Sequence, residues 1–209
     1  SDLNAGSSNT TGSITAYGTN TLLANTSGVA NTAIGGYDYA NSGAAALQSN
    51  ISGSYNTAVG TGSLQANTTA SYNTAVGYQA GYSNTTGQPN TVVGSGALYS
   101  NQTSIHNVAF GYYALRNATA GGNTALGSQA GFNTTTGVDN VFVGGQATGY
   151  AAGLGNTTGS NNIFIGAYAA YTNTTGGANV AIGSQALQAN TTANYNTAVG
   201  YQALYSNTT

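Results

Sequence analysis

The sequence has almost no charged residues. Among 209 residues there are 1 Lys or Arg and 3 Asp or Glu, whereas about a quarter of the residues in an ordinary soluble domain carry a charge. The charged positions are Asp2, Asp38, Asp139 and Arg116, and the formal net charge is −2. Such sparse charges create no field that attracts nucleic acid or an anionic membrane surface, so we expect neither as a partner.

Cysteine is also absent, which excludes disulfide bonds and thiolate metal sites. No apolar run approaches the roughly 20 residues that cross a bilayer, so we predict no transmembrane segment. Hydrophobic residues still make up 40% of the chain, and its polarity comes from Asn, Thr, Ser and Gln together with 32 glycines. Stability must therefore come from packing and from backbone pairing.

A repeat of 17 residues runs through the chain. It is anchored by a glycine that follows an apolar residue, and these glycines are Gly18, Gly35, Gly60, Gly77, Gly94, Gly111, Gly127, Gly144, Gly166, Gly183 and Gly200. Three spacings differ, at 25, 16 and 22 residues. We interpret residues 1–209 as a single repeat array of about eleven units, with insertions near 35–43 and 151–155. The array stops in mid-unit at Thr209, so we expect either that the protein continues or that the next subunit completes the register.

Within the unit, frequent glycine and β-branched residues argue against helix. In the unit that ends the chain we predict one strand on Asn196–Gly200 and a second on Tyr201–Tyr205, with a turn at the following Ser-Asn-Thr-Thr. We expect the residue before each anchor glycine, such as Val199, to form one core column, and Leu204 and its equivalents to form another. The predicted fold is all-β: an elongated repeat protein of stacked ~17-residue β units, as a β-solenoid or β-roll or as tandem β-hairpins.

Groups able to perform catalysis are scarce. The chain offers His106 and three separated aspartates, and none recurs at a fixed place in the unit. The glycines are not followed by the Gly-Lys-Ser/Thr of a phosphate-binding loop. We therefore predict no enzyme, no cofactor and no metal. The tyrosines are expected to cover the core with the ring and expose the hydroxyl, or alternatively to form an aromatic surface for sugars or partner strands.

One motif recurs in nearly every unit. Asn-x-Ser/Thr sequons lie in the predicted turns, at Asn9, Asn25, Asn50, Asn67, Asn84, Asn101, Asn117, Asn133, Asn156, Asn173, Asn190 and Asn207. They form a regular row of candidate sites for N-linked glycans, with O-linked sugars on the same edge as a related candidate. Alternatively, Asn and Thr stand there as turn formers, and stacked asparagines make an amide ladder.

The unit Asn-Thr-Ala-Val-Gly-Tyr-Gln-Ala-Leu-Tyr-Ser-Asn-Thr-Thr, at residues 196–209, resembles the repeat arrays of bacteriophage tail fibres. It is also similar to the repeats of trimeric autotransporter adhesin heads, which build a parallel β-roll. The resemblance covers nearly the whole chain and implies a repetitive extracellular fibre.

We accordingly expect a structural subunit of an extracellular fibre or filament, such as a bacterial surface or matrix fibril or an adhesin shaft. Its expected partners are copies of itself, in an end-to-end polymer or a homotrimer, and covalent glycans. A bacteriophage tail-fibre shaft, located on the virion, is the alternative. An ice- or carbohydrate-binding solenoid with a flat Thr/Asn face is the third hypothesis.

Overall fold

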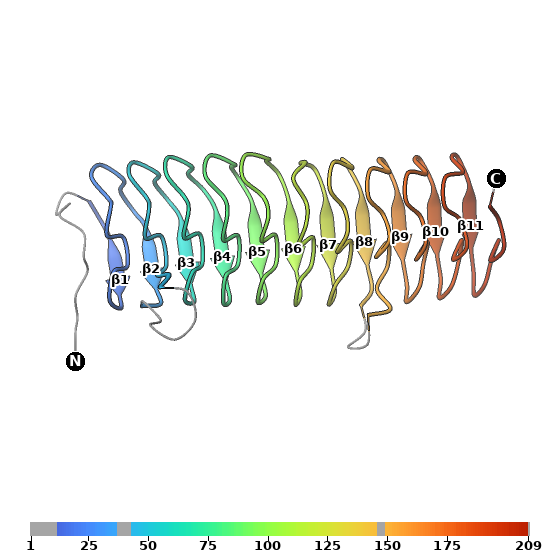
Figure 1. Cartoon of the computed structure of the whole chain (residues 1–209), viewed down its shortest axis with the longest axis horizontal. Coiled ribbons are helices and arrows are strands. Elements are labelled where there is room, and N and C mark those ends of the chain that lie inside the picture. The colour runs from blue at the N-terminus through green and yellow to red at the C-terminus, as the bar shows by residue number, and fades with distance from the viewer. Residues whose placement is uncertain (1–11, 37–42, 146–148, 209) are drawn as a thin grey trace. The chain divides into compact units, whose positions relative to one another are not determined.

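The protein consists of stacked coils that each contribute one short β-strand. The computed structural model describes residues 12–36, 43–145 and 149–208, and it contains eleven three-residue strands and no helix in these ranges (Figure 1). The chain divides into two compact units, residues 1–106 and 107–209, and each has the same construction.

The strands of each unit pair in parallel and in chain order. Unit 1 contains β1 (Thr15–Tyr17), β2 (Thr32–Ile34), β3 (Thr57–Val59), β4 (Thr74–Val76) and β5 (Thr91–Val93). Unit 2 contains β6 (Val108–Phe110), β7 (Thr124–Leu126), β8 (Val141–Val143), β9 (Ile163–Ile165), β10 (Val180–Ile182) and β11 (Thr197–Val199). Equivalent residues of neighbouring coils lie opposite one another, as Ala58 does to Ala75. Parallel pairing confirms the predicted all-β repeat fold and identifies it as a β-solenoid, because hairpins would pair antiparallel.

The predicted second strand is wrong. The segment Tyr201–Tyr205 forms turns, with Gln202 and Leu204 in the left-handed region at φ 55° and 48°. Alternate left-handed residues coil the backbone, so an extended strand cannot form there. The segment nevertheless bonds to the preceding coil, since the Leu187 N–H donates to the Ala203 carbonyl at 3.0 Å.

The predicted core column before the anchor glycine is also wrong. From β2 to β11 the middle residue of each strand, such as Ala75, points inward and is buried, whereas Val76 is 36% and Val199 66% exposed. Side chains alternate along a strand, and the narrow interior of a 17-residue coil accepts alanine more readily than a branched side chain. The leucine column is buried in most coils, at Leu22, Leu47, Leu64, Leu98, Leu115 and Leu187. Leu204, by contrast, is 48% exposed.

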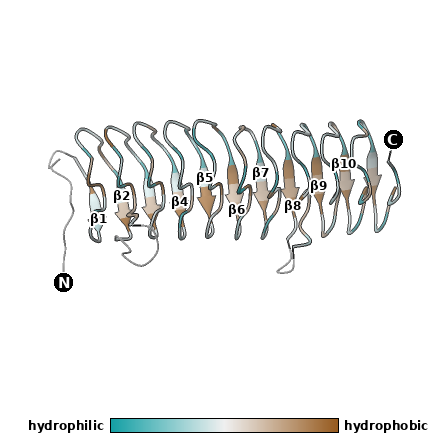
Figure 2. Ribbon diagram, in the orientation of Figure 1, coloured by the Kyte–Doolittle hydropathy of each residue, from teal (hydrophilic) through white to brown (hydrophobic). Residues whose placement is uncertain are grey.

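Two columns of side chains therefore face outward along the strands. In unit 1 the first residue of every strand is threonine, and in unit 2 it is valine or isoleucine in four of six strands. The third residue is apolar throughout. Figure 2 shows the result most clearly at β8 and β9, which are hydrophobic along their length.

The anchor glycines allow the coils to approach closely. Gly60 has φ 126°, and a Cβ atom there would lie 2.5 Å from the Gly77 carbonyl oxygen of the next coil. Gly183 is placed in the same way against Gly200. Any larger residue would separate the coils at this corner, which explains why the glycine sets the repeat.

Both longer spacings arise at one corner of the coil. In regular coils an N–H three residues after the anchor glycine donates to its carbonyl, as Ala169 does to Gly166. In the two longer coils, the Ala46 N–H donates to the Gly35 carbonyl and the Ala152 N–H donates to the Gly144 carbonyl. The first additional segment thus lies between Gly35 and Ala46, in the region expected, although residues 37–42 lie outside the described ranges. The second lies between Gly144 and Ala152, mostly before the expected 151–155.

Candidate functional site

Most of the predicted glycan sites lie inside the coils. Eight sequon asparagines are at most 2% exposed: Asn25, Asn50, Asn67, Asn84, Asn101, Asn156, Asn173 and Asn190. Asn67 is representative, because its Nδ2 donates to the Ala70 carbonyl at 3.0 Å and to Asn50 Oδ1 at 2.7 Å. Its own Oδ1 accepts from Asn84 Nδ2 at 3.1 Å. Each amide bonds to its own turn and, in successive coils, to its neighbour, so these asparagines form the amide ladder that the sequence left as the alternative.

This burial is incompatible with an N-linked glycan on those eight asparagines in the folded protein. Both hydrogens of Asn67 Nδ2 are used inside the coil, and a sugar would replace one of them and occupy the packed interior. Asn117, Asn133 and Asn207 are half-buried instead. At the first two, the sequon is shifted by one residue, and Ala118 and Thr134 take the inner position. Asn9 lies outside the described residues.

A second buried asparagine column was not anticipated from the sequence. It stands just before each strand from β2 onward, at Asn31, Asn56, Asn73, Asn90, Asn107, Asn123, Asn140, Asn162, Asn179 and Asn196, of which Asn196 is half-buried. Asn73 Oδ1 accepts from the Asn90 backbone N–H at 2.8 Å, while its Nδ2 donates to the Gly87 carbonyl at 3.0 Å. An Asn precedes every strand from β2 onward and was the available signal, but the predicted strands include it, as in Asn196–Gly200.

The ionisable residues do not come together. Within the described ranges, no three His, Cys, Asp or Glu side chains are grouped as a metal site. His106 and Asp139 are exposed, with left-handed backbones at φ 60° and 55°, and Asp2 and Asp38 lie outside those ranges. The Arg116 guanidinium stacks over the Tyr113 ring, 4.8 Å from its centroid.

Several tyrosines stack along the coils. The rings of Tyr55 and Tyr72 are 5.1 Å apart and inclined by 3°, and those of Tyr82 and Tyr99 are 5.0 Å apart. Tyr150 and Tyr168 are closer, at 4.4 Å. Desolvation, then a hydrogen bond with the Tyr150 side chain, raises the pKa of Tyr168 to about 12. These rings cover the outside of the coils, and the stacking of equivalent residues follows from the repeat.

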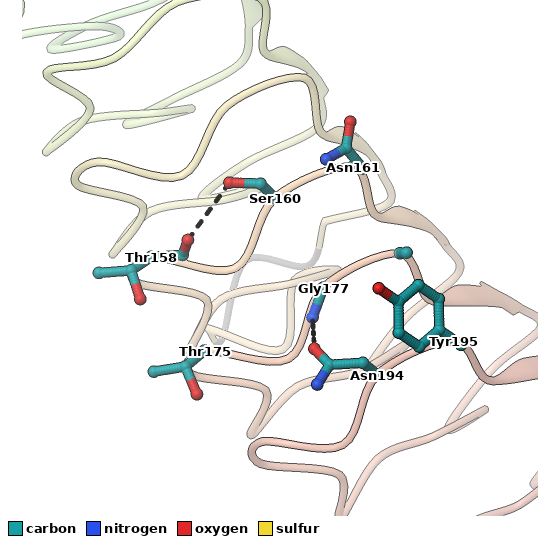
Figure 3. Close-up of a pocket in the computed structure, with 8 residues that line it drawn as sticks. Thr158, Ser160, Asn161, Thr175, Gly177, Asn194 and Tyr195 are labelled. Atoms are coloured by element: carbon teal, nitrogen blue, oxygen red, sulfur yellow. Dashed lines mark hydrogen bonds between the residues drawn. The ribbon is translucent and has the colours of Figure 1, made fainter.

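A polar groove crosses three coils of unit 2 (Figure 3). Its volume is about 270 Å³. It is lined by Thr158, Ser160, Asn161, Thr175, Gly177, Ala178, Asn194 and Tyr195, a set that we call the Tyr195 groove. Hydroxyl and amide groups dominate it, Tyr195 supplies an aromatic ring that is 86% exposed, and none of these side chains is charged. The sequence singled out no residue of this groove as part of a site.

Comparison with known proteins adds no family. No family model, curated protein or solved structure matches this chain. Within the described residues there is also no helix long and apolar enough to cross a membrane.

Proposed function

We propose that this chain is a structural subunit of an extracellular fibre or filament. The observation that carries the proposal is the continuity of the bonding from coil to coil. In unit 1, Nδ2–Oδ1 bonds run without interruption from Asn25 to Asn101, at 2.7 to 3.1 Å. A backbone ladder runs beside them through β1 to β5. Load along such a stack is shared among many parallel bonds, which suits a mechanical role.

The outward columns of the strands support self-association. Leu126 is 53% exposed, and Phe110, Ile182 and Val199 also present apolar surface to solvent. No charged residue stands in either column, so two copies can meet face to face without repulsion. Exposed apolar surface of this regularity is typical of protein contacts. We therefore propose a second copy of this chain as the partner on the strand face.

A bacteriophage tail-fibre shaft is the second candidate, favoured by the same outward columns. Three copies arranged around an axis would bury the columns along their common centre, as a closed cyclic assembly does. An open filament instead requires contacts that repeat without closing. The mass of the assembly separates the two candidates.

The polar turns support an exposed, hydrated edge. Their second threonines, such as Thr69, Thr86 and Thr136, are exposed, and O-linked sugars on such hydroxyls would add to the solubility of a nearly uncharged chain. A cell-surface or extracellular location is part of the same proposal, with the virion as its alternative.

Electron microscopy and sedimentation of the purified chain test this function. We expect filaments, or trimers if the tail-fibre arrangement holds, and we expect Leu126→Lys to weaken the association by placing charge in the outward column. Thr136→Lys, which adds the same charge on the exposed turn, is the matched control and should assemble normally. A chain that stays monomeric at every concentration, or that associates equally well as both variants, would contradict the proposal.

A further inference from the structure

The Tyr195 groove lies at a gap in a column that Tyr55 and Tyr72 fill with stacked rings in unit 1. The residue before the inner asparagine at the start of each strand has a left-handed backbone in most coils, with φ of 59° at Tyr55, 61° at Tyr72, 54° at Ala178 and 60° at Tyr195. In unit 1, Tyr55 and Tyr72 stack on each other at 5.1 Å. In unit 2 the neighbour of Tyr195 in this column is Ala178, whose methyl group leaves room for a ring beside Tyr195. Ala178 and Tyr195 both line the groove, and no described aromatic ring contacts Tyr195.

A second gap lies in the column one residue earlier in each coil, which contains Ser54, Ser160 and Gly177. This gap concerns the backbone N–H of Ser160. In several other coils the N–H of this column donates to the side chain one coil further on, as Ser54 does to Ser71 Oγ at 2.9 Å and Val138 to Ser160 Oγ at 3.1 Å. The position that follows Ser160 is Gly177, which has no side chain to accept. Ser160 lines the groove, and its N–H donates no hydrogen bond to any residue in the described ranges.

The remaining polar groups of the groove are neutral. Asn194 Oδ1 accepts from the Gly177 N–H at 2.7 Å, which orients the amide and leaves Nδ2 as a donor. Asn161 and the hydroxyls of Thr158 and Thr175 make no side-chain hydrogen bond to any residue that the structure describes. Figure 3 shows Gly177 joined to Asn194 beside the Tyr195 ring. The groove thus combines one exposed aromatic ring with hydrogen-bond donors and acceptors from hydroxyl, amide and backbone groups.

We propose that the Tyr195 groove binds the ring of a neutral sugar. The C–H face of a pyranose stacks on the Tyr195 ring, in the place that a second tyrosine takes in unit 1. One sugar hydroxyl accepts from the Ser160 N–H, and others bond to Asn194 Nδ2 and to Asn161. The volume of about 270 Å³ lies just below the usual range of roughly 300–1,000 Å³ for small-molecule sites, so it suits a single ring. This binding activity goes beyond the fibre function and does not depend on it.

Saturation-transfer NMR with the full chain tests the site. The probes are glucose, galactose, mannose and N-acetylglucosamine as neutral sugars, with glucuronic acid as a charged comparison and a neutral polysaccharide to reveal whether a chain end is preferred. We expect transfer to at least one neutral sugar, with loss of the signal in Tyr195→Ala. We also expect the transfer signal to be lost in Ala178→Tyr, because the new ring would fill the gap. Tyr72 shows that a tyrosine is accepted at this position with the same backbone conformation.

Matched variants separate binding from folding. Tyr72→Ala removes a ring from the same column where no gap exists, and it should leave sugar binding unchanged. Thermal unfolding should be unchanged in Tyr195→Ala, since the side chain is 86% exposed. The proposal is overturned if no neutral sugar gives transfer. It is equally overturned if the transfer persists in folded Tyr195→Ala and Ala178→Tyr, or if Tyr72→Ala abolishes it.

Discussion

The ring of Phe142 occupies the space that a side chain on Gly153 would need. A Cβ atom on Gly153 would lie 2.4 Å from Phe142 Cδ1, and one on Gly131 would lie 2.5 Å from Cδ2 of the same ring. Most strand centres carry alanine, and the leucine column then fills the coil from the opposite side. Around Phe142 the leucine column gives way to Gly131 and Gly153.

The packing of Phe142 against Gly153 can be measured by a double-mutant cycle. Phe142→Ala should lower the free energy of unfolding by about 3–5 kcal/mol, because it leaves a cavity. Gly153→Ala should cost about 3 kcal/mol through overpacking and left-handed backbone strain. The double variant removes the clash with Phe142, so it should be about 1–2 kcal/mol more stable than the sum predicts. Chemical unfolding measures all three.

Gly62→Ala is the control for that cycle. Its φ of 71° resembles that of Gly153, but the added Cβ would meet its nearest neighbour at 3.2 Å. It should therefore show the backbone strain alone. Strict additivity of the two unit 2 substitutions would refute the packing relationship.

The inner amide ladder should contribute strongly to stability. Asn67→Ala removes the bonds to Asn50, Ala70 and Asn84 and leaves buried partners unsatisfied, so we expect a loss of about 2–4 kcal/mol. Asn133→Ala is the matched control, because Asn133 is also a sequon asparagine but makes no side-chain hydrogen bond to protein. It should change stability by less than about 0.5 kcal/mol. Equal effects in the two variants would show that the ladder is not stabilising.

Glycan mapping of the native protein checks the burial of the sequons. We expect unmodified Asn67, Asn84 and Asn173 in mass spectra of proteolytic peptides, because their Nδ2 atoms are bonded inside the coils. Any sugar should be found on exposed turn residues such as Thr69 or Thr86. A hexose or N-acetylhexosamine on Asn67 of the folded protein would be inconsistent with this structure.

Tyrosine titration provides a test at high pH. The pKa of Tyr168 is raised to about 12, above the ordinary value of about 10. Between these values the unfolded chain has lost the phenol proton and the folded chain retains it, so the contribution of Tyr168 to stability falls as pH rises from about 10 to about 12. Tyr150→Phe should lower the highest pKa in the phenolate absorbance titration. Tyr72→Phe should leave that pKa unchanged, and the same shift in both variants would contradict the role of the Tyr150 hydrogen bond.

The period and the class of fold were predictable because they depend on spacing alone. Glycine every 17 residues, with β-branched residues beside it, leaves parallel stacking of coils as a natural solution. The direction of the side chains was not predictable in the same way. Hydrophobicity alone favours Val76 as the core residue, yet Ala75 is buried in its place, because the available volume rather than the apolar character decides which one points inward.

The candidate site was harder still to foresee. The Tyr195 groove depends on what neighbouring coils lack, namely a side chain at Gly177 and a ring at Ala178. Such gaps are visible only once the register has aligned Ala178 with Tyr195. The asparagines were difficult for another reason. A buried amide ladder and a row of exposed sequons have the same amino-acid sequence.

The corner after the anchor glycine has accepted two additions of different length. Gly35 and Gly144 keep their carbonyl bonds to Ala46 and Ala152 despite the intervening residues, and the strands on either side stay in register. Foreign peptides grafted at the equivalent corner of other coils should therefore be displayed at intervals set by the coil spacing of about 4.8 Å. The fold could thus serve as a ruler for arranging epitopes or enzymes along a line.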